Sequence, residues 1–342
     1  MKTTRENRLH GQGYDSLLKH IALAGSLLLD NNSDTHGANT SALEFTFICF
    51  PEVHSWDISG LLLFFLLAAL TSNVMLLAVI VIEPRLHHPM YYLLAMLSMV
   101  DICLSSVVTP KILVMLWTGS MTVTASACFT QMFFTVMFSA SESSIFMVMA
   151  FDRYVAICDP LRYPSVMTKQ FVAKALVFMV VRNTAVALPL TLLAVNLDYC
   201  SSREILHCFC ESMTVEKLSC SDITPSSLYG LVAFIVVGGS DGLLIIISYL
   251  AILRTVAATR SGSVACKAFR TCVSHLIVIC MFYITVATTI VSNRVVKEIP
   301  RPAHVVLSLL HHLLAPALNP MVYGVLTKEI RQRVLGKMNI HP

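Results

Sequence analysis

Long apolar runs, separated by short polar connections, dominate the chain from residue 58 onward. About 20 mostly apolar residues are enough to cross the roughly 30 Å of hydrocarbon in a bilayer as a helix. Residues 58–82 are the clearest case, because this run carries no charged side chain. Six further runs meet the same requirement: 90–115, 123–150, 171–197, 228–253, 272–292 and 303–325. The pattern predicts an all-α membrane protein, a seven-transmembrane helix bundle over 58–325, with an N-terminal tail over 1–57 and a C-terminal tail over 326–342.

The composition of the chain agrees with this reading. Of its 342 residues, 56% are hydrophobic and 13% are charged, whereas about 25% charged is usual in soluble proteins. The mean hydropathy is +0.73. These values exclude a disordered, collagen-like or small disulfide-stapled protein. The net charge of +4 is too small for a generally basic nucleic-acid binder, so we expect no nucleic-acid partner.

The distribution of basic residues predicts the orientation of the bundle. Lys and Arg concentrate in cytoplasmic loops of membrane proteins. Here they concentrate in the first, third and fifth connections and the C-terminal tail, and the other connections hold fewer cations, offset by Glu and Asp. We therefore expect the C-terminus in the cytoplasm and the N-terminus outside. Two glycosylation sequons, at Asn31 and Asn39, fall in the tail expected to be extracellular.

Ionisable side chains inside membrane spans are costly, so each is first considered as functional. By residue counting, Asp101, Glu142, Asn73 and Asn319 lie at similar depth and are expected to share one hydrated pocket. Two carboxylates there would either share a proton or hold a small cation, for which sodium is the plausible metal. The alternative is a protonated polar cluster that only joins helices. Asp241 in the fifth span is expected to make a helix-to-helix hydrogen bond rather than a ligand contact.

Sequence motifs at the expected cytoplasmic ends of the spans are the most specific feature of the chain. They are MAFDRYVAICDPLRY at 149–163, PMYYLL at 89–94, LSMVD at 97–101, KAFRTCVSHL at 267–276 and PALNPMVYG at 316–324. Together they resemble the motifs of olfactory receptors in the rhodopsin-like G-protein-coupled receptor superfamily. The resemblance covers about 39–333, and Phe151 with the segment 207–211 resembles the class I, fish-like subgroup. Arg270 departs from the family pattern, which commonly has a small residue there.

The resemblance implies a multi-pass receptor of the plasma membrane that binds an odorant and activates a stimulatory heterotrimeric G protein, raising cyclic AMP. A transporter is disfavoured because the two halves of the chain show no internal repeat. An enzyme is disfavoured because no nucleophile motif occurs and the adjacent His311 and His312 would point about 100° apart on a helix. A retinal photoreceptor is excluded because 303–325 contains no Lys for a Schiff base.

The resemblance also implies a set of switch residues. The Arg153 guanidinium can be held by Asp152 in one state and released toward another helix or the G protein in the other. Pro320 removes a helical hydrogen bond, which allows the seventh span to bend and turn Tyr323 inward. The full set expected in coupling is Asp152, Arg153, Tyr154, Tyr249, Asn319, Pro320 and Tyr323.

By the family pattern, Cys128 pairs with Cys210 and Cys200 pairs with Cys220. Cys208 is then left unpaired unless it takes Cys49, and the sequence leaves both possibilities open. After the seventh span, residues 328–338 alternate cations with apolar residues at helical spacing. This predicts a short amphipathic helix on an anionic lipid surface.

The ligand pocket is expected in the outer half of the third, fifth and sixth spans, beneath the second extracellular loop. The candidate lining residues are Met132, Val136, Ser139, Ala140, Tyr283, Ala287, Ile290 and Arg294. Mostly apolar walls favour a small, semi-volatile organic molecule, although helix packing is the alternative role for each of these residues.

Arg294 is the one cation among the candidate pocket residues, three turns beyond Tyr283. A guanidinium there can bind a carboxylate with two hydrogen bonds, so a carboxylic acid is expected among the ligands. The alternative is that Arg294 reaches the outer lipid headgroups or pairs with Glu211.

Overall fold

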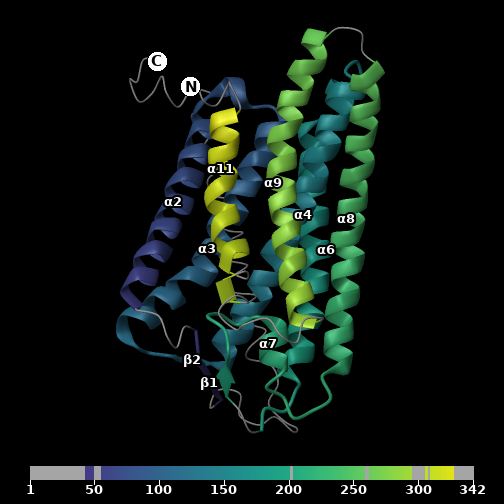
Figure 1. The fold of residues 1–342 in the computed structure, drawn as a ribbon. Helices are drawn as coiled ribbons and strands as arrows, with labels where there is room; N and C mark the ends of the chain where they lie inside the picture. Colours follow the sequence, from purple (N-terminus) through teal and green to yellow (C-terminus); the bar gives the residue numbers. More distant parts are fainter. Residues whose placement is uncertain are drawn as a thin grey trace, which may run out of the picture. The chain divides into compact units, whose positions relative to one another are not determined.

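The computed structural model describes residues 43–49, 55–200, 203–258, 262–294, 305–306 and 309–326. In this part of the chain, long helices run side by side as a bundle (Figure 1). The helices of the bundle are α2 (Ser55–Ile82), α3 (Pro89–Thr118), α4 (Ala125–Cys158), α6 (Lys169–Val195), α8 (Thr224–Ala258), α9 (Gly262–Arg294) and α11 (Ala315–Leu326). Shorter helical segments are η1 (Pro84–Leu86), α5 (Tyr163–Val166), α7 (Ser212–Glu216) and the π-helical turn η2 (Leu310–Leu314).

Within the described residues, five helices are long and apolar enough to cross a membrane: Ser59–Ile82, Pro89–Thr118, Ala125–Cys158, Lys169–Val195 and Thr224–Ala258. Within α9, the segment His275–Ile290 is a shorter apolar stretch. Each of these overlaps a run that the hydrophobic pattern predicts as a span. Several helices continue past the apolar run into polar sequence, as α4 does through Asp152 and Arg153.

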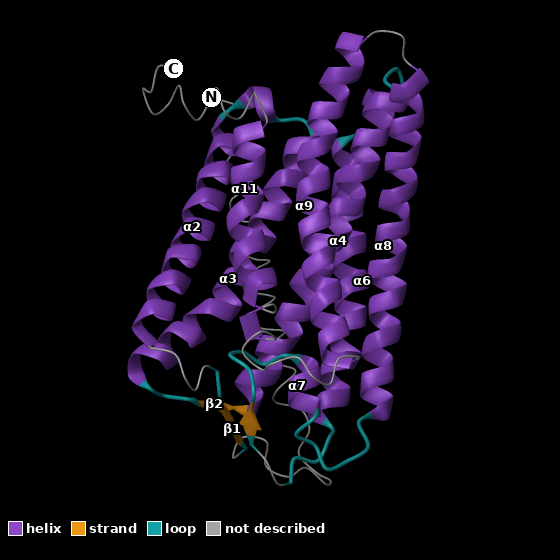
Figure 2. Cartoon of the chain, in the orientation of Figure 1, coloured by secondary structure: helices purple, strands orange, loops and turns teal. Residues whose placement is uncertain are grey.

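The centre of the bundle is α4, which packs against α3, α6 and α8. The outward faces remain apolar, with Phe64 of α2, Val177 of α6 and Ile235 of α8 all more than half exposed. A helix that is apolar on its exposed face as well as its buried face suits a lipid environment, where the backbone hydrogen bonds close within the helix. Helices account for most of the described residues (Figure 2).

Helix boundaries follow local sequence signals. Thr124 and Thr168 cap the N-termini of α4 and α6, each accepting a hydrogen bond from a backbone N–H three residues later. Gly119 ends α3 with φ of 70°, a left-handed conformation that suits glycine. Pro110, Pro189 and Pro320 lie inside α3, α6 and α11, where each removes one backbone donor.

A small three-stranded sheet covers one end of the bundle. Strand β1 (Glu44–Phe47) lies between β2 (Thr122–Thr124), to which it is antiparallel, and β3 (Glu204–Ile205), to which it is parallel. The hydrophobic pattern did not predict this sheet, whose first strand belongs to the segment expected to be an N-terminal tail. Phe45 and Phe47 of β1 are fully buried, and Phe45 packs edge-on against Phe129 and Tyr199.

The part of the chain that the structure describes contains three disulfides, all at one end of the bundle, which we call the disulfide end. The structure pairs Cys128 with Cys210 and Cys200 with Cys220. It also pairs Cys208 with Cys49, which resolves the alternative that the sequence left open. The long connection between α6 and α8 is therefore tied to α4, to β1 and to itself.

Some sequence predictions fall outside the described residues. These are the sequons at Asn31 and Asn39 and the amphipathic helix expected over 328–338. The backbone of Arg294 ends α9, but its side chain also lies outside the described part.

Candidate functional site

A cavity of about 250 Å³ lies among α4, α6, α8, α9 and η2 and is covered by the 209–216 segment. Its walls are mainly apolar, with Leu190 from α6, Phe234 from α8 and Val286 from α9 among the contributors. Such a lining, with few polar groups, is typical of sites for small organic molecules.

Most of the sequence-predicted pocket residues line this cavity. They are Met132, Val136, Ser139, Ala140, Tyr283 and Ile290. The prediction for Ala287 is wrong, because this residue lies on the exposed face of α9. Val286 lines the cavity instead. It lies three residues after Tyr283, and Ile290 lies seven residues after Tyr283, so the three side chains share one face of α9.

The 209–216 segment, which we call the lid, contains two glutamates that accept hydrogen bonds from residues of the same segment. Glu211 caps α7, its Oε2 accepting from Thr214 N at 2.8 Å and from Thr214 Oγ1 at 2.6 Å. The buried Glu216 accepts from Ser212 Oγ at 2.6 Å. Burial raises the pKa of nearby Tyr199 well above its ordinary value, and the Glu216 carboxylate raises it further. Tyr199 therefore stays protonated and donates to the carbonyl of Ala194 at 2.8 Å.

Two histidines that the sequence did not assign to the pocket also line the cavity. His311 and His312 of η2 are buried, with ring centroids 4.7 Å apart. Although adjacent residues diverge on a helix, both rings reach the cavity. The His312 ring contacts Phe209 of the lid at 4.8 Å, and the His311 ring contacts Phe282 of α9 at 5.3 Å.

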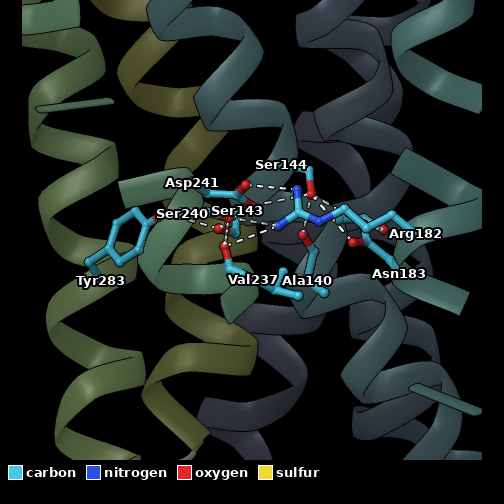
Figure 3. Close-up of polar contacts among 10 residues, drawn as sticks. Ala140, Ser143, Ser144, Arg182, Asn183, Val237, Ser240, Asp241 and Tyr283 are labelled. Carbon is cyan, nitrogen blue, oxygen red and sulfur yellow. Dashed lines mark hydrogen bonds and ion pairs between the residues drawn. The ribbon is translucent and has the colours of Figure 1, made fainter. Parts of the chain in front are cut away.

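A polar network joins four helices at the inner end of the cavity. Figure 3 shows the Arg182 guanidinium of α6 directed at Asp241 of α8, with an Nη1 to Oδ1 distance of 2.8 Å. Ser143 of α4 donates to the other oxygen of Asp241 at 3.0 Å. Because the Ser143 proton is committed there, the Tyr283 hydroxyl of α9 donates to Ser143 Oγ at 2.9 Å.

Further hydrogen bonds extend this network to Val237 and Asn183. Arg182 also donates to the Val237 carbonyl at 3.0 Å. Asn183 lies beside Ser144 and donates to it at 3.3 Å. Asp241 makes the helix-to-helix hydrogen bonds predicted from its position, but its main partner Arg182 was not predicted. The available signal was a cation in the middle of an apolar run, which in a membrane span calls for a buried anion as partner.

The polar residues expected to share one pocket do come together in part. Asn319 of α11 donates to both oxygens of Asp101 of α3, at 3.2 and 3.1 Å. Asn73 of α2 donates to the carbonyl of Pro316 at 2.9 Å. The carboxyl groups of Asp101 and Glu142 interact with each other. Among the described residues, neither oxygen of the fully buried Glu142 accepts a hydrogen bond.

At the opposite end of the bundle, Arg153 is held by Asp152. Its Nε and Nη2 approach Asp152 Oδ2 at 3.0 and 2.5 Å, and Nη2 also contacts the sulfur of Met90. Tyr163 donates to the other Asp152 oxygen at 2.8 Å. Burial raises the pKa of Tyr163 well above its ordinary value, with the Asp152 charge adding to the shift, so this donor stays protonated. The structure therefore shows Arg153 paired with Asp152, as the sequence predicts for one of the two states of the switch.

The other expected switch residues lie near this end. Tyr249 of α8 and Tyr323 of α11 are buried in one apolar cluster with Ile252 and Ile279. The Tyr323 ring packs edge-on against His275 of α9 at 5.2 Å, facing inward as expected. Tyr154 packs at the margin of the same cluster.

Comparison with known proteins gives the family. Residues 62–340 match the olfactory receptor family. This chain belongs to the olfactory receptor family. It is 45% identical over 304 residues to olfactory receptor 56A4 of Homo sapiens, covering 88% of this chain and 97% of that one. It is 40% identical over 303 residues to olfactory receptor 56B34 of Mus musculus, covering 87% and 93%.

The fold comparison is consistent with that membership. The structure of squid rhodopsin superposes with a TM-score of 0.69 at 14% identity, covering 90% of this chain and 91% of that one. At this identity the likeness concerns the fold, which is the rhodopsin-like helical bundle. The matches to receptors of the 51, 52 and 56 groups confirm the class I resemblance. The protein is therefore a multi-pass membrane olfactory receptor and not an enzyme.

Proposed function

We propose that this receptor binds a small, semi-volatile organic molecule in the cavity beneath the 209–216 lid and activates a stimulatory, olfactory-type G protein, raising cyclic AMP. The observation that carries the proposal is the position of Tyr283. Its side chain lines the cavity and its hydroxyl also joins the network of Ser143, Asp241 and Arg182. A ligand that contacts Tyr283 therefore acts on the contact between α9 and the rest of the bundle.

The proposed signal travels as a shift between two packed states. A ligand changes the population of a conformation only if it binds that conformation better than the other. Ligand contacts that favour a moved Tyr283 ring favour a moved α9, whose opposite end faces the Arg153 region. Release of Arg153 from Asp152 then exposes the guanidinium to the carboxyl terminus of the G protein.

The test of this function is a cyclic-AMP reporter screen in cells that express the receptor, using acids, alcohols, aldehydes and ketones. At least one agonist is expected, and its response is expected to be a rise in cyclic AMP. A receptor present at the cell surface that responds only through calcium, with no cyclic-AMP rise, would count against this coupling.

A carboxylic acid is proposed among the agonists, held by Arg294 at the outer end of α9. A charge-assisted hydrogen bond contributes about 1.5–3 kcal/mol, or roughly tenfold to a hundredfold in affinity. Arg294→Ala is therefore expected to lower the potency of an acid more than that of the alcohol with the same chain. Equal losses for the two compounds would refute the anchoring role.

We also propose that sodium binds beside Asp101 and Glu142. The oxygens available there suit a hard cation, because Glu142, Asn73 Oδ1 and Ser105 Oγ are buried without a hydrogen-bond partner among the described residues. Asp101 and Glu142 would supply the charge, and the bound ion would favour the closed packing of α3, α4 and α11.

A further inference from the structure

The cavity contains a second polar feature, a contact between His311 and Ser139 at its inner end. Both side chains line the cavity, and His311 Nε2 lies 3.4 Å from Ser139 Oγ. The other ring nitrogen, Nδ1, lies 3.2 Å from Thr285 Oγ1 of α9, which does not line the cavity. One edge of the imidazole thus faces a helix and the other faces the space for the ligand.

The hydrogen bonds of Thr285 decide which edge of the neutral ring carries the proton. The Thr285 hydroxyl donates its single proton to the backbone carbonyls of Met281 and Phe282, both at 2.9 Å. Its oxygen can then only accept from His311, so Nδ1 holds the ring proton. A neutral imidazole has one N–H, and Nε2 therefore presents a lone pair toward Ser139 and the cavity.

The contact of Nε2 with Ser139 is a weak one. At 3.4 Å it is longer than the 2.5–3.0 Å typical of a hydroxyl donor, so little is lost when the two atoms separate. A ligand oxygen can take a place between them. If that oxygen belongs to a hydroxyl group, it donates its proton to His311 Nε2 and accepts the proton of Ser139.

We infer that His311 and Ser139 form a subsite selective for a hydroxyl group, so that alcohols and phenols are preferred over ketones, aldehydes and ethers of the same skeleton. The inference rests on the proposed function, since it assumes that the odorant occupies this cavity. A carbonyl or ether oxygen has no proton to give. It can accept from Ser139, but it leaves the Nε2 lone pair facing an apolar ligand in a cavity lined by Met132 and Val136.

The size of the preference follows from the cost of an unpaired buried acceptor. Sites built to hydrogen-bond a polar group discriminate strongly against analogues that lack it. For one neutral acceptor we expect an alcohol to be about tenfold or more as potent as the matching ketone. The subsite is separate from Arg294, which concerns acids at the outer end of α9.

The experiment measures cyclic AMP in cells that express the receptor, across primary alcohols and methyl ketones of equal carbon number from six to ten. The variants are His311→Leu, Ser139→Ala and His311→Gln, compared at equal surface levels. His312→Leu is the matched control, because His312 lies on the same turn and lines the same cavity but contacts the Phe209 ring.

Both His311→Leu and Ser139→Ala are expected to lower alcohol potency by about tenfold while changing ketone potency by less than about threefold. His311→Gln keeps an acceptor near the position of Nε2 and is expected to retain part of the alcohol preference. His312→Leu is expected to change alcohol and ketone alike. If His311→Leu fails to reach the surface, the losses of alcohol and ketone potency are compared in Ser139→Ala alone.

Equal potency of alcohol and ketone at the unmodified receptor overturns the subsite, and so do equal losses for both compounds in Ser139→Ala. Either result leaves the proposed function standing, because the receptor still responds. No cyclic-AMP response to any compound of the screen overturns the proposed function and the subsite together.

Discussion

The Asp101 carboxylate receives two hydrogen bonds from Asn319, whereas Glu142, equally buried, receives none from the described residues. A buried charge without a donor is costly, so Glu142 is either protonated or compensated by a cation. The two carboxyl groups at one depth were foreseeable from residue counting along the spans. That only Asp101 receives hydrogen bonds from Asn319 was not foreseeable, because the rotation of α11 decides which carboxyl group Asn319 can contact.

Neutralising Glu142 with Glu142→Gln is expected to remove the sodium dependence of signalling while surface expression stays near normal. The amide keeps the size of the side chain but takes away the charge that would hold the ion. The measurement is agonist-evoked cyclic AMP in sodium medium and in medium where choline replaces sodium. Glu83→Gln, on the connection between α2 and α3, is the control. A sodium response that survives Glu142→Gln would mean that the cluster only joins helices.

The helices α6 and α8 are held together by the Arg182–Asp241 pair. Arg182 is 18% exposed and Asp241 is fully buried, and the pair has further partners in Ser143 and Val237. Two charges removed from water contribute little net stability, but removing one of them leaves the other unpaired. The pair therefore fixes which faces of the two helices meet.

Asp241→Leu alone is expected to destabilise the receptor by about 3–5 kcal/mol, because Arg182 is left without its anion. The double variant Asp241→Leu with Arg182→Met removes both charges and is expected to recover most of that loss. Thermal denaturation of the purified receptor, together with surface staining, measures both effects. A double variant that is as unstable as the sum of the two single variants would show that the two side chains act independently.

At the level of elements, the apolar runs predicted the positions of the spans because about 20 consecutive apolar residues leave few alternatives. The run 123–150 lies almost entirely within α4, which continues past it to Cys158 through the charged residues Asp152 and Arg153. The strand β1 escaped prediction because it is four residues long and pairs with segments far away in the sequence. Ala287 was misplaced because spacing alone does not fix the rotation of a helix.

Viewed as a whole molecule, the receptor has a disulfide end that covers the cavity and, at the other end, the Arg153 cluster that we propose meets the G protein. The Cys49–Cys208 disulfide joins residues 159 apart in the sequence, and it links the segment that follows β1 to the residue that precedes the lid. The cysteine count left this pairing open because connectivity depends on which loops the fold brings together.

Removing that disulfide with Cys49→Ser and Cys208→Ser is expected to lower the free energy of unfolding by about 2–4 kcal/mol, since a long loop in the unfolded chain is released. Thermal denaturation measures the change. Cys280→Ser is the control, because Cys280 is unpaired and exposed on the outside of the bundle. An unchanged melting temperature in the double serine variant would show that this disulfide contributes nothing.

The decisive comparison uses two neighbouring residues of α8. Ala233 lines the cavity, whereas Val232 is 48% exposed on the outward face of the same turn. A Phe at 233 fills the space proposed for the odorant, and a Phe at 232 adds the same ring to the lipid side. Agonist-evoked cyclic AMP is measured for both variants and the unmodified receptor at equal surface levels. We predict that Ala233→Phe lowers agonist potency at least about tenfold while Val232→Phe leaves it unchanged. An undiminished response in Ala233→Phe would contradict binding in this cavity.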